Sequence, residues 1–169
     1  MKQSLLILLI FPLFLTAQEP TFKKGLPEDL DREKIILLEH EPIELSIFEK
    51  KTKSSKYILR KQKNHNQIIQ QSNLKLKDAA LEYPFEYAIT TPSTYLSLAK
   101  AGYKYVLQSS VYTYKHLKQQ PSELTVFEYY IYDMRNNIAY EVFQIDEMEV
   151  YDFKLVIKKV NKAIKQDHQ

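Results

Sequence analysis

The stretch that decides the fold covers residues 102–115 and reads GYKYVLQSSVYTYK. In a half-buried strand, successive side chains point to opposite faces of the sheet. One face of this stretch carries Tyr105 and Leu107, and the other carries Val106 and Tyr112. Because neither face is purely polar, the pattern predicts an interior strand of a sheet with helices packed on it.

Two further strands are predicted directly after it, over residues 124–133 and 138–145. The loop between them ends with Asn136 and Asn137, and asparagine tolerates the positive φ that short hairpin loops need. Gly102, just before the first strand, suits the left-handed residue that ends a helix. We therefore expect three strands that form an antiparallel meander.

Upstream of the meander, strand and helix signals alternate. An apolar run predicts a buried strand at residues 34–40, and alternating side chains predict a strand at residues 85–90. A long helix is expected between them over residues 54–83, with Ser54 or Ser55 as its N-cap. A strand, helix, strand sequence implies a right-handed crossover and parallel pairing of the two strands.

Three shorter signals complete the expected order. A short helix should start at Thr91 and Pro92, because a threonine N-cap with proline at the first helical position is favoured. Residues 149–166 carry apolar side chains at i, i+3, i+4, i+7 and i+11, which predicts a final helix. Residues 43–48 read as a further short strand. The predicted fold class is α/β, in the order β-α-β-α-β-β-β-α, with a mixed sheet that is parallel in its N-terminal part and antiparallel in the meander.

The first 17 residues have the layout of a secretory signal peptide. Lys2 precedes an apolar run at residues 5–15 that is too short to span a bilayer comfortably, and Ala17 is a small residue at the cleavage position. An uncleaved N-terminal anchor is the alternative. We expect cleavage after Ala17, an extended N-terminal segment over residues 18–33 and a single domain over residues 34–166. The protein should then be periplasmic or extracellular, without a transmembrane segment in the mature chain.

Composition narrows the classes of function. Cleavage removes only Lys2 from the charged residues, so the mature chain would carry 23 basic and 21 acidic residues, which argues against a nucleic-acid partner. There is no cysteine, and Gly25 and Gly102 are the two glycines, so a glycine-rich phosphate cradle is excluded. The histidines lack metal-ligand spacing and no nucleophile motif occurs. We therefore predict no catalytic residue, no metal and no cofactor, and favour a non-enzymatic protein while leaving catalysis open.

One candidate ligand site follows from the predicted topology. In open α/β sheets, ligands bind beyond the carboxyl ends of the parallel strands, which here carry residues 39–41 (Glu-His-Glu) and 90–91 (Thr-Thr). The candidate ligand-binding residues are His40, Thr91 and Ser93. A helix that starts at Thr91 would point free N–H groups to this edge and favour an anion. Helix capping alone would also explain Thr91 and Ser93, and His40 could simply end a strand.

The second candidate site is a basic stretch at residues 50–63 that holds seven Lys or Arg residues and no acidic residue. Lys56, Arg60 and Lys61 lie near the predicted start of the long helix, where positive charge is mildly unfavourable. An ordinary solvated surface would explain them. The alternative is an anionic partner, such as an envelope protein, an acidic glycan or an anionic lipid surface.

The leader that ends in Leu15-Thr16-Ala17-Gln18, followed by a cysteine-free body rich in Lys, Ile and Tyr, resembles small secreted proteins of Bacteroidota. The predicted element order is similar to that of periplasmic accessory domains such as the N-terminal domain of the Tol translocation protein. Since no catalytic or cofactor motif occurs, we expect a non-enzymatic binding or accessory domain of the cell envelope that binds through its sheet face or its basic loop and helix. The alternative is a small anionic-ligand binder or a hydrolase that uses the edge near His40 and Thr91.

Overall fold

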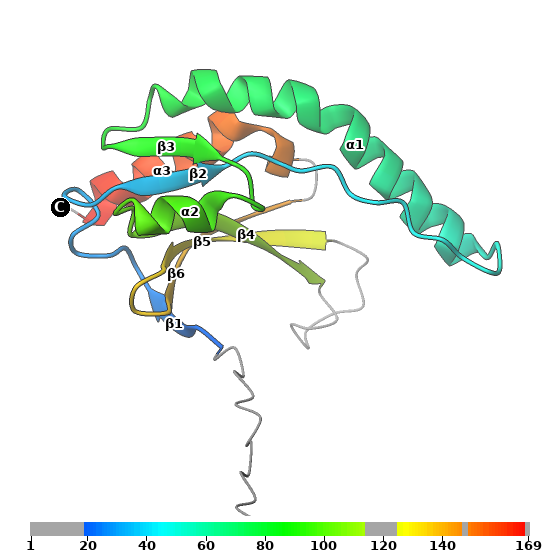
Figure 1. Ribbon diagram of the computed structural model, residues 1–169, viewed down its shortest axis with the longest axis horizontal. Helices are drawn as coiled ribbons and strands as arrows, with labels where there is room; N and C mark the ends of the chain where they lie inside the picture. Colours follow the sequence, from blue (N-terminus) through cyan, green and yellow to red (C-terminus); the bar gives the residue numbers. More distant parts are fainter. Residues whose placement is uncertain (1–18, 114–124, 147–148, 168–169) are drawn as a thin grey trace, which may run out of the picture.

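The computed structural model describes residues 19–113, 125–146 and 149–167. Within these ranges the chain forms a mixed sheet of six strands in the order β1-β6-β5-β4-β2-β3, with helices on both of its faces (Figure 1). The elements are β1 Thr21–Lys24, β2 Ile35–Leu38, α1 Lys53–Ala80, β3 Tyr87–Thr90, α2 Tyr95–Lys100, β4 Tyr105–Thr113, β5 Thr125–Asp133, β6 Ile138–Asp146, the 3-10 helix η1 Glu149–Tyr151 and α3 Phe153–Asp167. The predicted α/β class and mixed sheet are confirmed.

The antiparallel meander forms as the alternation predicted. β4 pairs antiparallel with β5, and β5 pairs antiparallel with β6. Asn137 adopts a φ of 54° in the loop between β5 and β6, and Gly102 adopts a φ of 96° after α2. Both residues therefore hold the left-handed conformations expected of them.

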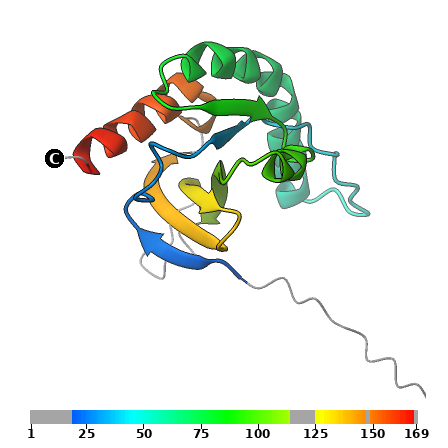
Figure 2. The same cartoon turned by 60° about the vertical axis from the view of Figure 1, so that its left-hand side comes forward.

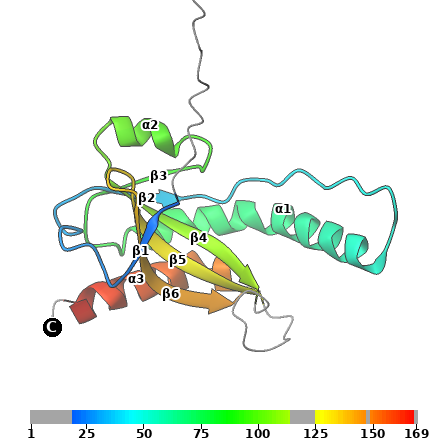
Figure 3. The same ribbon diagram turned by 90° about the horizontal axis from the view of Figure 1, so that it is seen from below.

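The parallel part of the sheet is built around β2. This strand pairs in parallel with β3 on one side and with β4 on the other. The connection after β2 contains α1, which lies with α3 on one face of the sheet, whereas the connection after β3 contains α2, which lies on the opposite face (Figures 2 and 3). The carboxyl ends of β2 and β3 thus lead to opposite faces, which is the arrangement that opens a crevice in α/β sheets.

The hydrophobic core lies between the sheet and the two helices α1 and α3. Its strand residues include Leu37, Leu107 and Ile131, and α3 contributes the periodic apolar side chains that predicted it. The buried apolar side chains of α1 are confined to its second half, from Ile69 to Ala80. Because the first half of α1 buries no apolar side chain, the helix has few apolar residues at helical spacing in the sequence.

The N-terminal segment contributes more to the sheet than its polar sequence indicates. β1 pairs in parallel with β6, and the ring of Phe22 lies edge-on to that of Tyr130 with centroids 5.6 Å apart. Further along, Leu30 is buried in the main core. The sequence analysis missed β1 because Phe22 is the one apolar residue among its four.

Several predicted boundaries are wrong. Residues 43–48 form no strand, since their backbone bonds to side chains of α1 instead. The N-cap of α1 is Thr52, in a capping box with Ser55, rather than Ser54 or Ser55. The short helix starts at Tyr95 with Thr94 as its N-cap, because the chain first makes a turn in which the Thr94 N–H donates to the carbonyl of Thr91 at 3.1 Å. The predicted signal peptide at residues 1–17 lies outside the described ranges, as do Gln18 and the predicted strand residues Tyr114, Lys115 and Leu124.

Candidate functional site

A projection formed by residues 41–66 extends beyond the sheet. It consists of the first half of α1 and of the chain before it, which runs back along the helix (Figures 1 and 3). We refer to residues 39–52 as the strap. The candidate partner-binding residues Lys56, Arg60 and Lys61 all lie in the helical limb of this projection.

Amide side chains of α1 hold the strap in place. The side chain of Asn73 accepts from the N–H of His40 and donates to its carbonyl, both at 2.9 Å. Asn66 does the same for Ile43, with both distances 2.8 Å. Gln62 accepts from the N–H of Ser46 at 2.9 Å. These bonds satisfy polar groups of the strap backbone that would otherwise need a neighbouring strand.

The base of the projection is joined to η1 through an aromatic cluster. His65 Nε2 lies 2.9 Å from the carbonyl oxygen of Glu41 and donates to it, because a carbonyl can only accept. Its Nδ1 shares a hydrogen bond of 2.8 Å with the hydroxyl of Tyr151. The ring of His40 stacks on that of Phe153, with centroids 4.9 Å apart.

Positive charge gathers on the exposed side of the helical limb. Lys53, Lys56, Arg60 and Lys63 are all exposed, and their spacing of three, four and three residues places them on one stripe of the helix. The first turn contains no acidic residue to offset them. Arg60 and Lys61 also lie over the ring of Tyr57, at 5.5 and 5.4 Å from its centroid.

Large apolar side chains are exposed on the same projection. Ile47 in the strap is 99% exposed, and the strap residues Ile43 and Leu45 and the helix residues Tyr57 and Ile58 are between 40% and 47% exposed. Scattered exposed apolar residues are normal, but several on one projection that also carries a basic stripe indicate a contact surface.

The predicted ligand edge is assembled at the carboxyl ends of β2 and β3. The side chain of Glu41 lies against the turn before α2, where its Oε1 accepts from the N–H of Ser93 at 3.1 Å and from its hydroxyl at 2.5 Å. These bonds and one from the Thr91 side chain lower the pKa of Glu41. His40, Thr91 and Ser93 therefore lie around one edge, and Glu41, which the sequence analysis did not select, connects its two sides.

A pocket of about 270 Å³ opens at this edge. Its walls combine apolar side chains with the ends of the two diverging strands β2 and β4, and His40 and Glu41 are among the residues that line it. Thr91 and Ser93 lie beside it, on the far side of Glu41.

His40 is held in its neutral form. Burial first, and the neighbouring His65 second, lower the pKa of His40 to about 4, although a hydrogen bond with the backbone of Val150 acts in the opposite sense. Its buried Nε2 has no hydrogen-bond partner among the described residues. The described hydrogen bonds of Ser93 run to Glu41 and Thr91 rather than to a histidine, so they do not form a hydroxyl nucleophile with an imidazole base.

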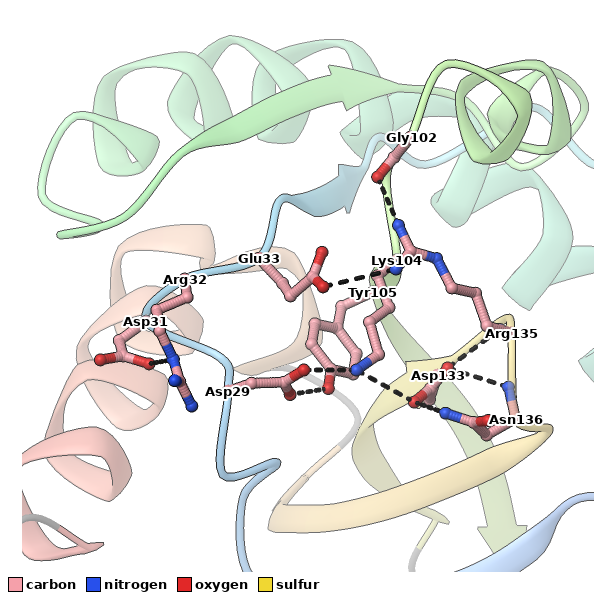
Figure 4. A network of polar contacts seen from close by, with 10 residues as sticks. All are labelled: Asp29, Asp31, Arg32, Glu33, Gly102, Lys104, Tyr105, Asp133, Arg135 and Asn136. Carbon is pink, nitrogen blue, oxygen red and sulfur yellow. Dashed lines mark hydrogen bonds and ion pairs between the residues drawn. The ribbon is translucent and has the colours of Figure 1, made fainter.

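A second polar cluster lies at the other end of β4 (Figure 4). Lys104 Nζ lies 2.5 Å from the carboxylate of Asp29 and 3.7 Å from that of the buried Asp133, and the Tyr105 hydroxyl donates to Asp29. Burial opposes the charge on Lys104, but the hydrogen bonds to Asp29 and Tyr105 outweigh it and raise the pKa of the ammonium. Asp133 also accepts from the N–H groups of Arg135 and Asn136 in the hairpin. This cluster ties the N-terminal segment to β4 and the hairpin, and every charge in it is paired.

The described residues contain no group of three His, Asp or Glu side chains able to hold a metal ion. None of the helices in the described ranges is long and apolar enough to cross a membrane. Comparison with known proteins finds no matching family model, no matching curated protein and no matching solved structure.

Proposed function

We propose that this protein is an exported, non-enzymatic binding module that attaches to an anionic membrane surface of the cell envelope through its projection. The observation that carries the proposal is that one projection holds both the basic stripe of α1 and several exposed aliphatic side chains. Basic residues next to exposed apolar ones are the combination that binds the interface of an anionic bilayer, because the charges attract acidic lipids and the apolar groups enter the headgroup region.

The shape of the projection supports the same partner. It extends away from the sheet (Figure 1), so it can approach an extended surface without the rest of the domain in the way. Ile47 is 99% exposed and lies in the strap within a few residues of Lys50 and Lys51. Hydrogen bonds to the amide side chains of Asn66 and Gln62 fix the strap to α1. They hold the apolar and basic groups in one arrangement before any partner arrives.

Vesicle binding tests the proposal. The chain from residue 18 onward should sediment with vesicles that contain phosphatidylglycerol and not with pure phosphatidylcholine vesicles, and high salt should release it. Each Lys or Arg near such a surface contributes about 1 kcal/mol, so the triple variant Lys56→Glu, Arg60→Glu, Lys61→Glu should bind at least about a hundredfold more weakly.

A matched control removes the same charge elsewhere. Lys158, Lys162 and Lys165 are exposed on α3, so their joint replacement by glutamate changes the net charge equally. We expect this variant to retain most of the vesicle binding, with circular dichroism showing that both variants are folded. Equal losses in the two variants, or no binding to phosphatidylglycerol by the unaltered protein, would refute the membrane surface. Capture of an acidic protein instead, lost in the first triple variant, would refute the lipid partner and retain the basic contact surface.

Export is tested separately by mass spectrometry of the protein from its native cell. A chain that begins at Gln18 would support cleavage after Ala17. A full-length chain in the envelope would favour the uncleaved anchor.

A further inference from the structure

The pocket lies beyond the carboxyl end of β2, beside residues 107–109 of β4, and has a geometric origin. The two strands pair only from Ile35 to Leu37, opposite Tyr105 to Leu107. Beyond this point β4 continues alongside β5, whereas the chain after β2 turns away into the strap. The divergence leaves a wedge of about 270 Å³ between them.

The wedge is held open by hydrogen bonds on the side of β2. The N–H of Glu39 donates to the carbonyl of Thr90 at 2.8 Å, and the backbone of His40 is bonded on both sides by Asn73. The carbonyl of Glu41 is fixed by His65, and its carboxylate is fixed by Ser93. A pocket with walls fixed in this way exists before the ligand arrives.

The deepest residues of the pocket are apolar, although His40, Gln108 and Ser109 also line it. Its floor is made of Leu37, Leu76, Leu107 and Phe153, each of which is at most 6% exposed. An engineered apolar cavity of about 150 Å³ accepts benzene. The present pocket is larger, so it has room for a six-membered ring or a short aliphatic chain.

The mouth of the pocket is acidic. Glu39 and Glu41 line it, and the described lining contains no Lys or Arg. Lys77 lies 3.8 Å from the carboxylate of Glu39 and partly offsets it, but Glu41 makes no ion pair among the described residues. The N–H and hydroxyl of Ser93, which would otherwise receive an anion, already bond to Glu41.

We infer that this pocket binds a small organic cation, with its apolar body on the leucine and phenylalanine floor and its ammonium group at the carboxylate of Glu41. The sequence predicted an anion at this edge, on the basis of a helix N-terminus at Thr91. The inferred ligand has the opposite charge. The inference is independent of the membrane contact, because the pocket and the basic stripe use different residues.

Three isosteric probes test the inference by isothermal titration and by amide NMR shifts. Benzylamine, benzyl alcohol and benzoate share a ring and differ in the charge of one substituent. A charge-assisted hydrogen bond is stronger than a neutral one by about tenfold in affinity. We therefore expect benzylamine to bind about tenfold more tightly than benzyl alcohol, and benzoate to bind most weakly.

Two variants locate the effect. Glu41→Gln keeps an acceptor for Ser93 and removes the charge, so it should abolish the preference for benzylamine over benzyl alcohol while both still bind. Gln108→Trp places a large ring in the pocket from its lining and should abolish binding of all three probes. The triple charge reversal on α1 should leave probe binding unchanged.

Other results would overturn the inference. Benzoate binding as tightly as benzylamine would exclude an acidic mouth, and probe binding that survives Gln108→Trp in a folded protein would place the site elsewhere. Failure of all three probes to bind at about 10 mM would limit the binding free energy to less than about 3 kcal/mol. It would show that the pocket holds only water.

Discussion

Replacement of His40 by phenylalanine should make the stability of this protein less sensitive to acid. The pKa of His40 lies at about 4 instead of 6.5, chiefly because the imidazole is buried. As the pH falls from 7, the unfolded chain therefore takes up a proton on this side chain before the folded chain does. Folding stability from the neutral imidazole is complete above about pH 6.5 and is lost progressively as the pH falls toward 4.

The size of the effect follows from the two pKa values. One pKa unit corresponds to about 1.4 kcal/mol, so the change from 6.5 to about 4 amounts to about 3 kcal/mol between pH 7 and pH 4. Phenylalanine has a similar shape and no titrating group, and it also removes the buried Nε2 that lacks a partner. The His40→Phe protein should therefore lose about 3 kcal/mol less of its unfolding free energy than the unaltered protein over this range.

The assay is urea unfolding followed by circular dichroism at pH 7, 6, 5 and 4. Tyr83→Phe is the matched control, because the Tyr83 hydroxyl is also buried without a described hydrogen-bond partner, and burial raises its pKa further from this pH range. Its stability should depend on pH as that of the unaltered protein does. Parallel pH curves for the unaltered and His40→Phe proteins would refute the reasoning, since they would mean that His40 titrates alike in the folded and unfolded states.

Three further substitutions, two of them paired with a comparison variant, test the packing and the polar contacts by the same unfolding assay. Asn73→Ala removes both bonds to the backbone of His40 and should cost about 1–3 kcal/mol, whereas Asn66→Ala, at a more exposed pair, should cost less than about 1 kcal/mol; equal losses would contradict the difference in burial. Leu76→Ala should cost about 2–5 kcal/mol because Leu76 is 1% exposed, and Leu96→Ala, at 62% exposed, should change stability by at most about 0.5 kcal/mol. Asp133→Ala should cost about 3 kcal/mol, because it leaves two hairpin N–H groups without their acceptor and removes a partner of a largely buried lysine; a loss below about 1 kcal/mol would show that the cluster is not structural.

The meander was predictable because its signals are local. Alternating side chains define β4, β5 and β6. The residue types at Gly102 and Asn137 match the positive φ values that the turns need. The final helix was equally clear, since its apolar residues recur at helical spacing. In each case the residues that make the pattern also make the contacts.

The elements that escaped prediction depend on distant partners. The side chains of β1 are exposed, so they give no strand signal. The strand forms because its backbone bonds to β6, more than a hundred residues later in the chain. Residues 43–48 of the strap are strand-like in sequence, but their polar backbone groups bond to Asn66 and Gln62. An amide side chain on a helix gives no indication in the sequence that it will replace a neighbouring strand.

The candidate sites stay predictions. The carboxyl-edge rule placed attention on His40, Thr91 and Ser93, and the structure does bring their surroundings together. The same rule placed Glu41 at this edge, but it was not selected as a site residue, because a glutamate after a strand resembles any surface carboxylate. The basic run was visible in the sequence, but the exposed aliphatic residues beside it became visible only once the strap was placed.

The pair of hydrogen bonds between Ile43 and Asn66 has a consequence for how this chain can change in length. It closes residues 44–65 into a loop whose two ends are clamped side by side, outside the sheet. Insertions or deletions that lengthen or shorten both limbs equally would leave β2 and β3 in place, because neither strand depends on where the loop ends. The protein is therefore suited to carry a reach of variable length, or a grafted recognition segment, on a domain that does not need to adjust to it.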